Sequence, residues 1–182
     1  MNEGVKRIAV FGPESTGKTT LTAALAAHFG EPWSREFVRE YWDTHGATIT
    51  AGDLDAIARG QIAAEDSAAA AARRVAFCDT DLLTCVLWDD LLFPGHCPPW
   101  ARAEADRRAR DFALYLLCDT DLAFEPDPQR CFPDAAGRAM CRRLWRETLV
   151  NRGLPFVEIH GAGREREAAA IAAVDAVLAG AR

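Results

Sequence analysis

The chain has 182 residues, 49% hydrophobic and 26% charged, with a formal net charge of −6. This length and composition predict a single globular domain over residues 1–182. The acidic balance disfavours general binding to nucleic acid, because phosphate backbones require a basic protein face. No apolar run reaches membrane-spanning length and the N-terminus has no signal-peptide core, so we expect a cytoplasmic protein without a membrane partner.

The first predicted elements surround a phosphate-binding pattern. Residues 7–11 form a short β-branched and apolar run that is typical of a buried strand. Residues 12–19 read Gly-Pro-Glu-Ser-Thr-Gly-Lys-Thr, which is the P-loop or Walker A pattern G-x-x-x-x-G-K-[ST]. An apolar stripe at helical spacing then runs to Phe29 and is closed by Gly30 and Pro32. Strand, glycine loop and helix follow in the order that nucleoside-triphosphate binding requires.

In such a loop, backbone N–H groups and the helix dipole point at phosphate oxygens. Lys18 is expected to reach the outer phosphates and to neutralise charge during transfer, and the Thr19 hydroxyl to bind Mg²⁺. The cofactors predicted are therefore ATP and Mg²⁺. The predicted nucleotide-binding residues of the loop are Gly12, Glu14, Ser15, Thr16, Gly17, Lys18, Thr19 and Thr20.

Further along, strands and helices alternate. Strands are predicted over residues 33–38, 75–79, 112–118 and 156–159. Helices are predicted over 53–74, from 83 to 91, and over 101–110, 137–151 and 164–178, and the charges of 101–110 are interpreted as a solvated face. This alternation predicts an α/β P-loop fold of the nucleotide-kinase-like type, a three-layer sandwich with a mostly parallel five-stranded sheet.

Two strand ends carry the same short sequence. Cys-Asp-Thr-Asp-Leu occurs at residues 78–82 and again at 118–122. Carboxyl ends of parallel strands border the ligand crevice, so we expect both segments near the site. Asp79 has the place of a Walker B carboxylate beside Thr19 and is the predicted second Mg²⁺ ligand and a catalytic residue.

The cysteines give no sign of a metal site. None of the six belongs to a C-x-x-C pair and the four histidines are scattered, so a structural zinc site is not expected. In a reducing compartment the thiols are predicted to stay free, and small buried roles are expected for those at strand ends. They are Cys78, Cys85, Cys97, Cys118, Cys131 and Cys141.

Several segments together resemble the nicotinamide riboside kinase domain of NadR-type proteins. They are Glu14 to Leu21, the stretch Glu-Phe-Val-Arg-Glu-Tyr at 36–41, and Asp79-Thr80-Asp81 with Thr84. Gln61 and the closing segment from Gly161 to Arg166 match in place and order, so the similarity covers nearly the whole chain. The resemblance implies a P-loop kinase that phosphorylates the ribose 5′-hydroxyl of nicotinamide riboside to give nicotinamide mononucleotide.

The loop after the fourth predicted strand departs from the family. The family has tryptophan and then D-G-x-R, whereas this chain has Asp127-Pro128-Gln129-Arg130 after Phe124 and keeps only D-x-x-R. Proline in place of glycine stiffens the loop and removes a donor. The departure bears on the exact acceptor more than on phosphoryl transfer.

The resemblance, with the chemistry of the side chains, supplies further candidates. Arg130 keeps the family's position and is expected in a lid over the triphosphate, with a catalytic role, and Arg166 near the adenine. Glu36 and Asp81 both remain candidates to accept the hydroxyl proton or to bind ribose, and Tyr41 or Trp42 to lie against the pyridinium ring, with Trp88 in the core. The substrate-binding candidates are Glu36, Arg39, Tyr41, Trp42, Gln61, Asp81 and Asp127.

Other functions fit the same motifs. One is a kinase of this fold for another nucleoside or vitamin-like compound. Another is a non-metabolic switch that binds and slowly hydrolyses nucleotide. Such a switch requires a water-orienting Gln or an arginine from a partner, and the position of Gln61 on a helix far in sequence from the Walker B strand end disfavours it for that role. A polynucleotide 5′-kinase is a third, which the acidic charge disfavours. The partner predicted is a small molecule, and the sequence decides neither oligomeric state nor ATP against GTP.

Overall fold

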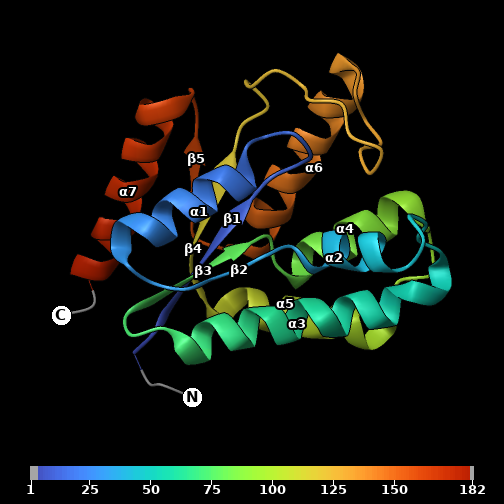
Figure 1. Ribbon diagram of the computed structural model, residues 1–182, viewed down its shortest axis with the longest axis horizontal. Helices are drawn as coiled ribbons and strands as arrows, with labels where there is room; N and C mark the ends of the chain where they lie inside the picture. Colours follow the sequence, from blue (N-terminus) through green and yellow to red (C-terminus); the bar gives the residue numbers. More distant parts are fainter. Residues whose placement is uncertain (1–3, 181–182) are drawn as a thin grey trace.

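Five parallel strands form one sheet in the order β2-β3-β1-β4-β5 (Figure 1). The computed structural model describes residues 4–180. The expected α/β architecture with a parallel five-stranded sheet is confirmed, and every neighbouring pair of strands is parallel. The strands are β1 (Lys6–Phe11), β2 (Trp33–Ser34), β3 (Val75–Asp79), β4 (Phe112–Cys118) and β5 (Phe156–Ile159).

Helices cover both faces of this sheet. Side chains of α1 and α7 pack with one face, and those of α3, α4, α5 and α6 pack with the other. Among residues 4–180, no helix is both long enough and apolar enough to cross a membrane. The helices are α1 (Lys18–Phe29), α2 (Phe37–Thr44), α3 (Leu54–Ala71), α4 (Leu82–Leu92), α5 (Pro99–Arg108), α6 (Ala135–Arg152) and α7 (Gly163–Ala179), with short 3-10 turns at Ala51–Asp53 and Ala109–Asp111.

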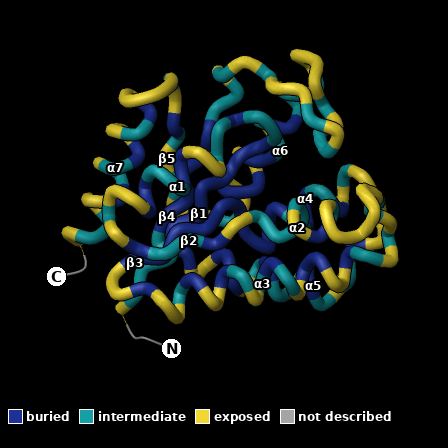
Figure 2. Tube along the Cα trace, in the orientation of Figure 1, coloured by how far each residue is buried: buried dark blue, intermediate teal, exposed yellow. Residues whose placement is uncertain are grey.

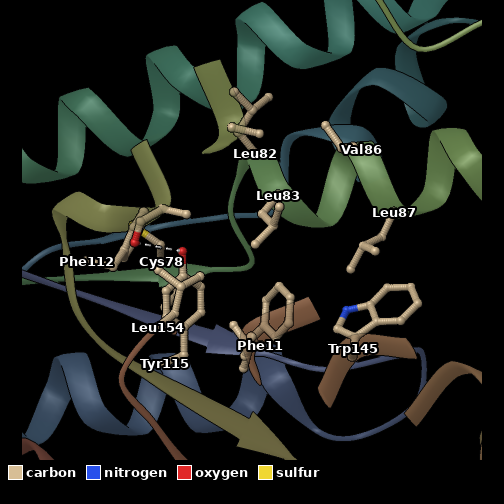
Figure 3. Packing of buried hydrophobic residues seen from close by; sticks show 14 of the residues in the cluster. Phe11, Cys78, Leu82, Leu83, Val86, Leu87, Phe112, Tyr115, Trp145 and Leu154 are labelled. Carbon is tan, nitrogen blue, oxygen red and sulfur yellow. Dashed lines mark hydrogen bonds between the residues drawn. The ribbon is translucent and has the colours of Figure 1, made fainter. Parts of the chain in front are cut away.

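The central strand β1 shows how the two cores are divided. Its side chains alternate between faces, so Ile8 and Val10 belong to the core under α1 and α7, and Phe11 to the opposite core. Phe11 packs edge-on against Tyr115, with ring centroids 5.3 Å apart, and also approaches Trp145 (Figure 3). The central strands β3, β1 and β4 are mostly buried, while the outer turns are exposed (Figure 2). This rigid layer fixes the loops at the strand ends.

Two predictions about the elements are wrong. The second strand ends at Ser34, and Phe37 and Val38 begin α2 instead of continuing the strand predicted over 33–38. Phe37 and Tyr41 lie one helical turn apart with ring centroids at 6.2 Å, a helical pairing that the aromatic and β-branched composition masked. The charged helix is not wholly solvated either, because Arg108 is buried and pairs with Glu65.

Candidate nucleotide and acceptor site

The P-loop connects the end of β1 to the start of α1. Gly12 has φ 147°, and a Cβ there would lie 2.9 Å from the Cys118 carbonyl oxygen, so only glycine fits the turn. The Lys18 ammonium donates to the Pro13 carbonyl at 2.8 Å and the Thr16 hydroxyl donates to the same oxygen at 2.9 Å. Both side chains thus bond to the backbone of the loop itself, and the Lys18 ammonium is held against the loop.

Thr19 and Asp79 form a pair suited to a divalent cation. The Thr19 hydroxyl donates to Asp79 Oδ2 at 2.5 Å. Asp79 is 1% exposed, and its Oδ1 is buried without a hydrogen-bond partner among residues 4–180. Burial, and then the nearby Glu36 carboxylate, raise the pKa of Asp79 to about 6. A carboxylate with an orphaned oxygen beside a hydroxyl fits Mg²⁺, which prefers oxygen ligands and would stabilise the charged form.

Arg166 is bonded to the backbone of the P-loop. It is 4% exposed, and its Nη2 donates to the Thr16 carbonyl at 2.8 Å. Its Nη1 donates to Asp121 Oδ1 at 3.0 Å and to the Gly161 carbonyl at 2.8 Å. Arg166 also lines the cavity that the P-loop borders, so it can hold the loop and contact a nucleotide at once.

The lid loop, residues 119–134, is fastened to the P-loop. Glu14 accepts the backbone N–H of Cys131 at 2.9 Å and that of Phe132 at 3.2 Å. The Ser15 hydroxyl accepts the Glu125 N–H at 2.8 Å and is 3.3 Å from Arg130 Nη1, which also donates to the Glu125 carbonyl. The glutamate in the P-loop therefore holds the lid loop over the phosphate site.

Glu36 and Arg39 present charge from the first turn of α2. Glu36 is the N-cap residue of that helix, and its carboxylate lies 3.4 Å from the Arg39 guanidinium. Arg39 also pairs with Asp127 of the lid loop at 3.2 Å. Arg39 thus connects the lid loop to Glu36, the carboxylate whose negative charge raises the pKa of Asp79.

A single cavity of about 670 Å³ joins these parts. Its near end is lined by the P-loop, including Lys18 and Thr19, with Arg130 and Arg166. Its middle is lined by Glu36 and Arg39. Volumes of this size hold small-molecule ligands. Residues at the far end come from α2, the segment between α2 and α3, the first turn of α3, and α4 with the residue that follows it. They include Trp42, Ile49, Leu54, Ile57, Cys85, Trp88, Asp89, Leu92 and Phe93.

The far end contains residues that the sequence reasoning missed. Asp89 is 6% exposed, has no salt-bridge partner within the described part of the chain, and lines the cavity beside Trp88. Burial raises its pKa to about 6, with a smaller opposing effect from a hydrogen bond with Cys97. Trp88, expected in the core, packs on Trp145 and also faces the cavity. A detectable signal existed, since Cys85, Trp88, Asp89 and Leu92 share one face of α4 at helical spacing.

Some predicted site residues lie off the cavity. Tyr41 is buried and donates its hydroxyl to Asp53 at 2.8 Å. Gln61 is fully buried beneath α2. Asp81 is buried too; it caps α4 through the Thr84 N–H and accepts the Tyr115 hydroxyl at 2.8 Å. Asp127 pairs with Arg39, which lines the cavity, and accepts the backbone N–H of Gln129. The hydrogen bonds of these side chains are thus made within the protein.

Fold and site together define a P-loop nucleotide-binding protein. A parallel sheet carries the phosphate loop at the end of its central strand, with a carboxylate from the adjacent strand against the loop threonine. The family model described as AAA domain matches residues 7–166, and the chain belongs to this family.

The resemblance to NadR-type proteins is confirmed by comparison. The chain is 29% identical over 159 residues to the trifunctional NAD biosynthesis/regulator protein NadR of Salmonella typhimurium and to that of Escherichia coli. The match covers 85% of this chain and 38% of the relatives, so the chain spans well under half of their length.

Solved structures show the same fold. A NadR protein in complex with NR superposes with a TM-score of 0.77 at 24% identity, covering 96% of this chain and 52% of that one. A NadR protein in complex with NAD and AMP-PNP gives 0.73 at 22%, covering 96% and 50%. Thymidylate kinase from Ehrlichia chaffeensis gives 0.61 at 14%, covering 96% and 99%. The nucleotide-kinase-like fold predicted from the sequence is confirmed.

Proposed function

We propose that the protein is a kinase that transfers the terminal phosphoryl group of ATP to the 5′-hydroxyl of nicotinamide riboside, giving nicotinamide mononucleotide. One observation carries the proposal: a continuous cavity has the P-loop at one end and Trp42, Trp88 and Asp89 at the other. Support also comes from the similarity to NadR proteins, one solved with NR and one with AMP-PNP.

The donor end is suited to ATP. Lys18 lies over the loop, where its charge can neutralise the outer phosphates, and the start of α1 supplies N–H donors. Thr19 and Asp79 would hold Mg²⁺, which would supply positive charge to offset the charge that develops on the phosphate oxygens. Arg130 of the lid loop lies at the same end and can share this charge. Phosphoryl transfer needs mainly this positioning and neutralisation.

The middle of the cavity is suited to the reacting hydroxyl. Glu36 lines it and Asp81 does not, which supports Glu36 as the carboxylate that accepts the proton of the 5′-hydroxyl. The oxygen of that hydroxyl forms the new bond to phosphorus as the bond to ADP breaks. Arg39, paired with Glu36, would orient this carboxylate.

The far end is suited to a flat cation. The pyridinium ring of nicotinamide riboside carries a positive charge, and aromatic faces attract cations. Trp42 and Trp88 offer two such faces from different helices, and Asp89 offers a carboxylate that no arginine or lysine neutralises at salt-bridge distance within residues 4–180. A neutral nucleoside base would gain less from this carboxylate, so the charge favours the cationic acceptor.

The direct test is to incubate the protein with Mg-ATP and nicotinamide riboside and to detect the mononucleotide by mass spectrometry. A panel of nucleosides and vitamins is run in parallel, with Lys18→Ala as the inactive control. Product from nicotinamide riboside alone supports the proposal. Product from another acceptor only would redirect it to a different kinase, and ATP hydrolysis unaffected by any acceptor would indicate a switch.

A further inference from the structure

The first turn of α2 rests on two adjacent residues of α3. Gln61 Oε1 accepts the backbone N–H of Phe37 at 3.0 Å. Gly60 lies directly under the Phe37 ring, because a Cβ added to it would be only 2.1 Å from Phe37 Cε1. A hydrogen bond from Gln61 and a close packing contact with Gly60 therefore both fix the position of Phe37, the residue that follows Glu36.

This N–H needs an outside partner. The first N–H groups of a helix have no acceptor within the helix, and Glu36, at the N-cap, makes no side-chain capping bond. Gln61 supplies the acceptor from a fully buried position. Burying an amide costs free energy unless both ends are bonded, and the nitrogen of Gln61 is 3.4 Å from Glu65 Oε1. Both ends of the amide are thus used inside the protein.

Glu65 extends the support to a second helix. Its Oε1 accepts the backbone N–H of Leu82, the first residue of α4, at 2.8 Å. Its Oε2 accepts from the buried Arg108 at 2.9 Å. Helix α4 therefore begins only three residues after Asp79. One buried carboxylate is therefore bonded to the start of α4 directly and to the start of α2 through Gln61.

We propose that Gln61 is a positioning residue for phosphoryl transfer, acting with Gly60 and Glu65. Together they fix the start of α2, which carries Glu36, relative to the start of α4, which follows Asp79. The inference rests on the proposed role of Glu36 in accepting the hydroxyl proton. Small displacements matter, since a shift of about 1 Å in a reacting group can cost about 100-fold in rate.

The test compares Gln61→Met, which keeps the volume and removes the acceptor, with the wild type. We expect the kcat for phosphorylation of the acceptor to fall about 10- to 100-fold. The Kd for Mg-ATP should stay within about twofold, because the P-loop lies on other elements. The rise in acceptor KM is expected to be smaller than the fall in kcat. Titration calorimetry and steady-state kinetics give these values.

Gly60→Ala tests the packing contact beneath the start of α2 instead of the hydrogen bond, since the added methyl group must displace the Phe37 ring. We expect the same fall in kcat and its partial rescue in the double variant Gly60→Ala/Phe37→Leu, whose smaller side chain relieves the clash. Gly52→Ala is the matched control, because its Cβ would meet Thr50 Oγ1 at an ordinary 3.6 Å. This control should behave as wild type.

Three results would overturn the proposal. The first is a wild-type kcat for Gln61→Met; the second is an equal loss of Mg-ATP affinity and kcat, which would indicate general loosening. The third is an absence of rescue in the double variant, which decides the question if Gln61→Met does not fold. If the wild type phosphorylates another acceptor instead of nicotinamide riboside, the proposed function fails, and the same variants are measured with that acceptor.

Discussion

The Glu14 carboxylate accepts the backbone N–H of Cys131 at 2.9 Å, which joins two residues 117 positions apart in the sequence. Glu14 is the third residue of the P-loop and Cys131 belongs to the lid loop, so the phosphate site and its cover are directly connected. Hydrogen bonds to charged groups contribute about 1.5–3 kcal/mol when they are protected from water, and less when exposed.

We therefore expect Glu14→Ala to release the lid loop. The KM for ATP should rise about 3- to 30-fold and limited proteolysis should cut residues 119–134 faster, because two backbone N–H groups lose their acceptor. Glu14→Gln, which keeps one neutral acceptor, should give an intermediate result. Glu147→Ala, on the exposed surface of α6, is the control. Unchanged proteolysis in Glu14→Ala would contradict this account of the lid loop.

Asp79→Asn should raise the Mg²⁺ concentration needed for half-maximal activity by about tenfold or more, since a neutral amide replaces the charged oxygen ligand. Mg²⁺ titration of the initial rate measures this. Asp90→Asn serves as the control, because Asp90 is exposed and pairs with Arg102 away from the loop. An identical Mg²⁺ dependence for Asp79→Asn and wild type would exclude Asp79 as a ligand.

The two neighbouring aromatic residues of α2 should respond differently. Trp42→Ala is expected to raise the KM for a cationic acceptor about 2- to 30-fold, which corresponds to the 0.5–2 kcal/mol of a cation–π contact. Tyr41→Phe should leave that KM unchanged, because the Tyr41 hydroxyl bonds to Asp53 and lies off the cavity. Steady-state kinetics with both variants measures this, and an unchanged KM in Trp42→Ala would exclude Trp42 as a contact of the ring.

Asp89 should make stability depend on pH. Its pKa is about 6 in the folded protein against an ordinary 3.8, so between these values the folded state holds a proton that the unfolded chain releases. The stabilisation is complete below the ordinary value and is lost as pH rises through about 6. We expect Asp89→Asn to gain stability relative to wild type over that window, by about 2–4 °C in Tm per kcal/mol.

Thermal unfolding of both proteins from pH 4 to pH 8 checks this difference. The groups that face Asp89 are Cys97, Asp90 and Arg102, and they are unchanged in the variant. A Tm difference that stays constant over the whole range would show that Asp89 does not titrate there.

Arg108→Ala should lower the free energy of unfolding by about 3–5 kcal/mol, because it leaves the fully buried Glu65 carboxylate without its charged partner. Arg107→Ala, one position away on the same helix, should change it by less than about 1 kcal/mol, since its bonds to Glu104 and Asp111 are exposed. Urea unfolding measures both. Equal effects would mean that the buried network contributes no more than a surface pair.

The sequence by itself determined the elements whose signals are local. The run before the P-loop, the glycines within it and the apolar strands ending at Asp79 and Cys118 are patterns of neighbouring residues, and they predicted the sheet and the phosphate end of the site. The start of α2 was predicted wrongly, because β-branched and aromatic residues favour a strand until Gly60 and Gln61 are known to lie beneath them.

Only the tertiary structure decided which polar residues face the cavity. Glu36 and Asp81 were equivalent candidates by sequence, yet packing turned Asp81 toward Tyr115 and left Glu36 on the cavity. Asp89 and Trp88 were brought to the far end by the way α4 packs, and Glu14 met Cys131 through a long-range contact. Such relations depend on how distant segments pack together, which no local periodicity records.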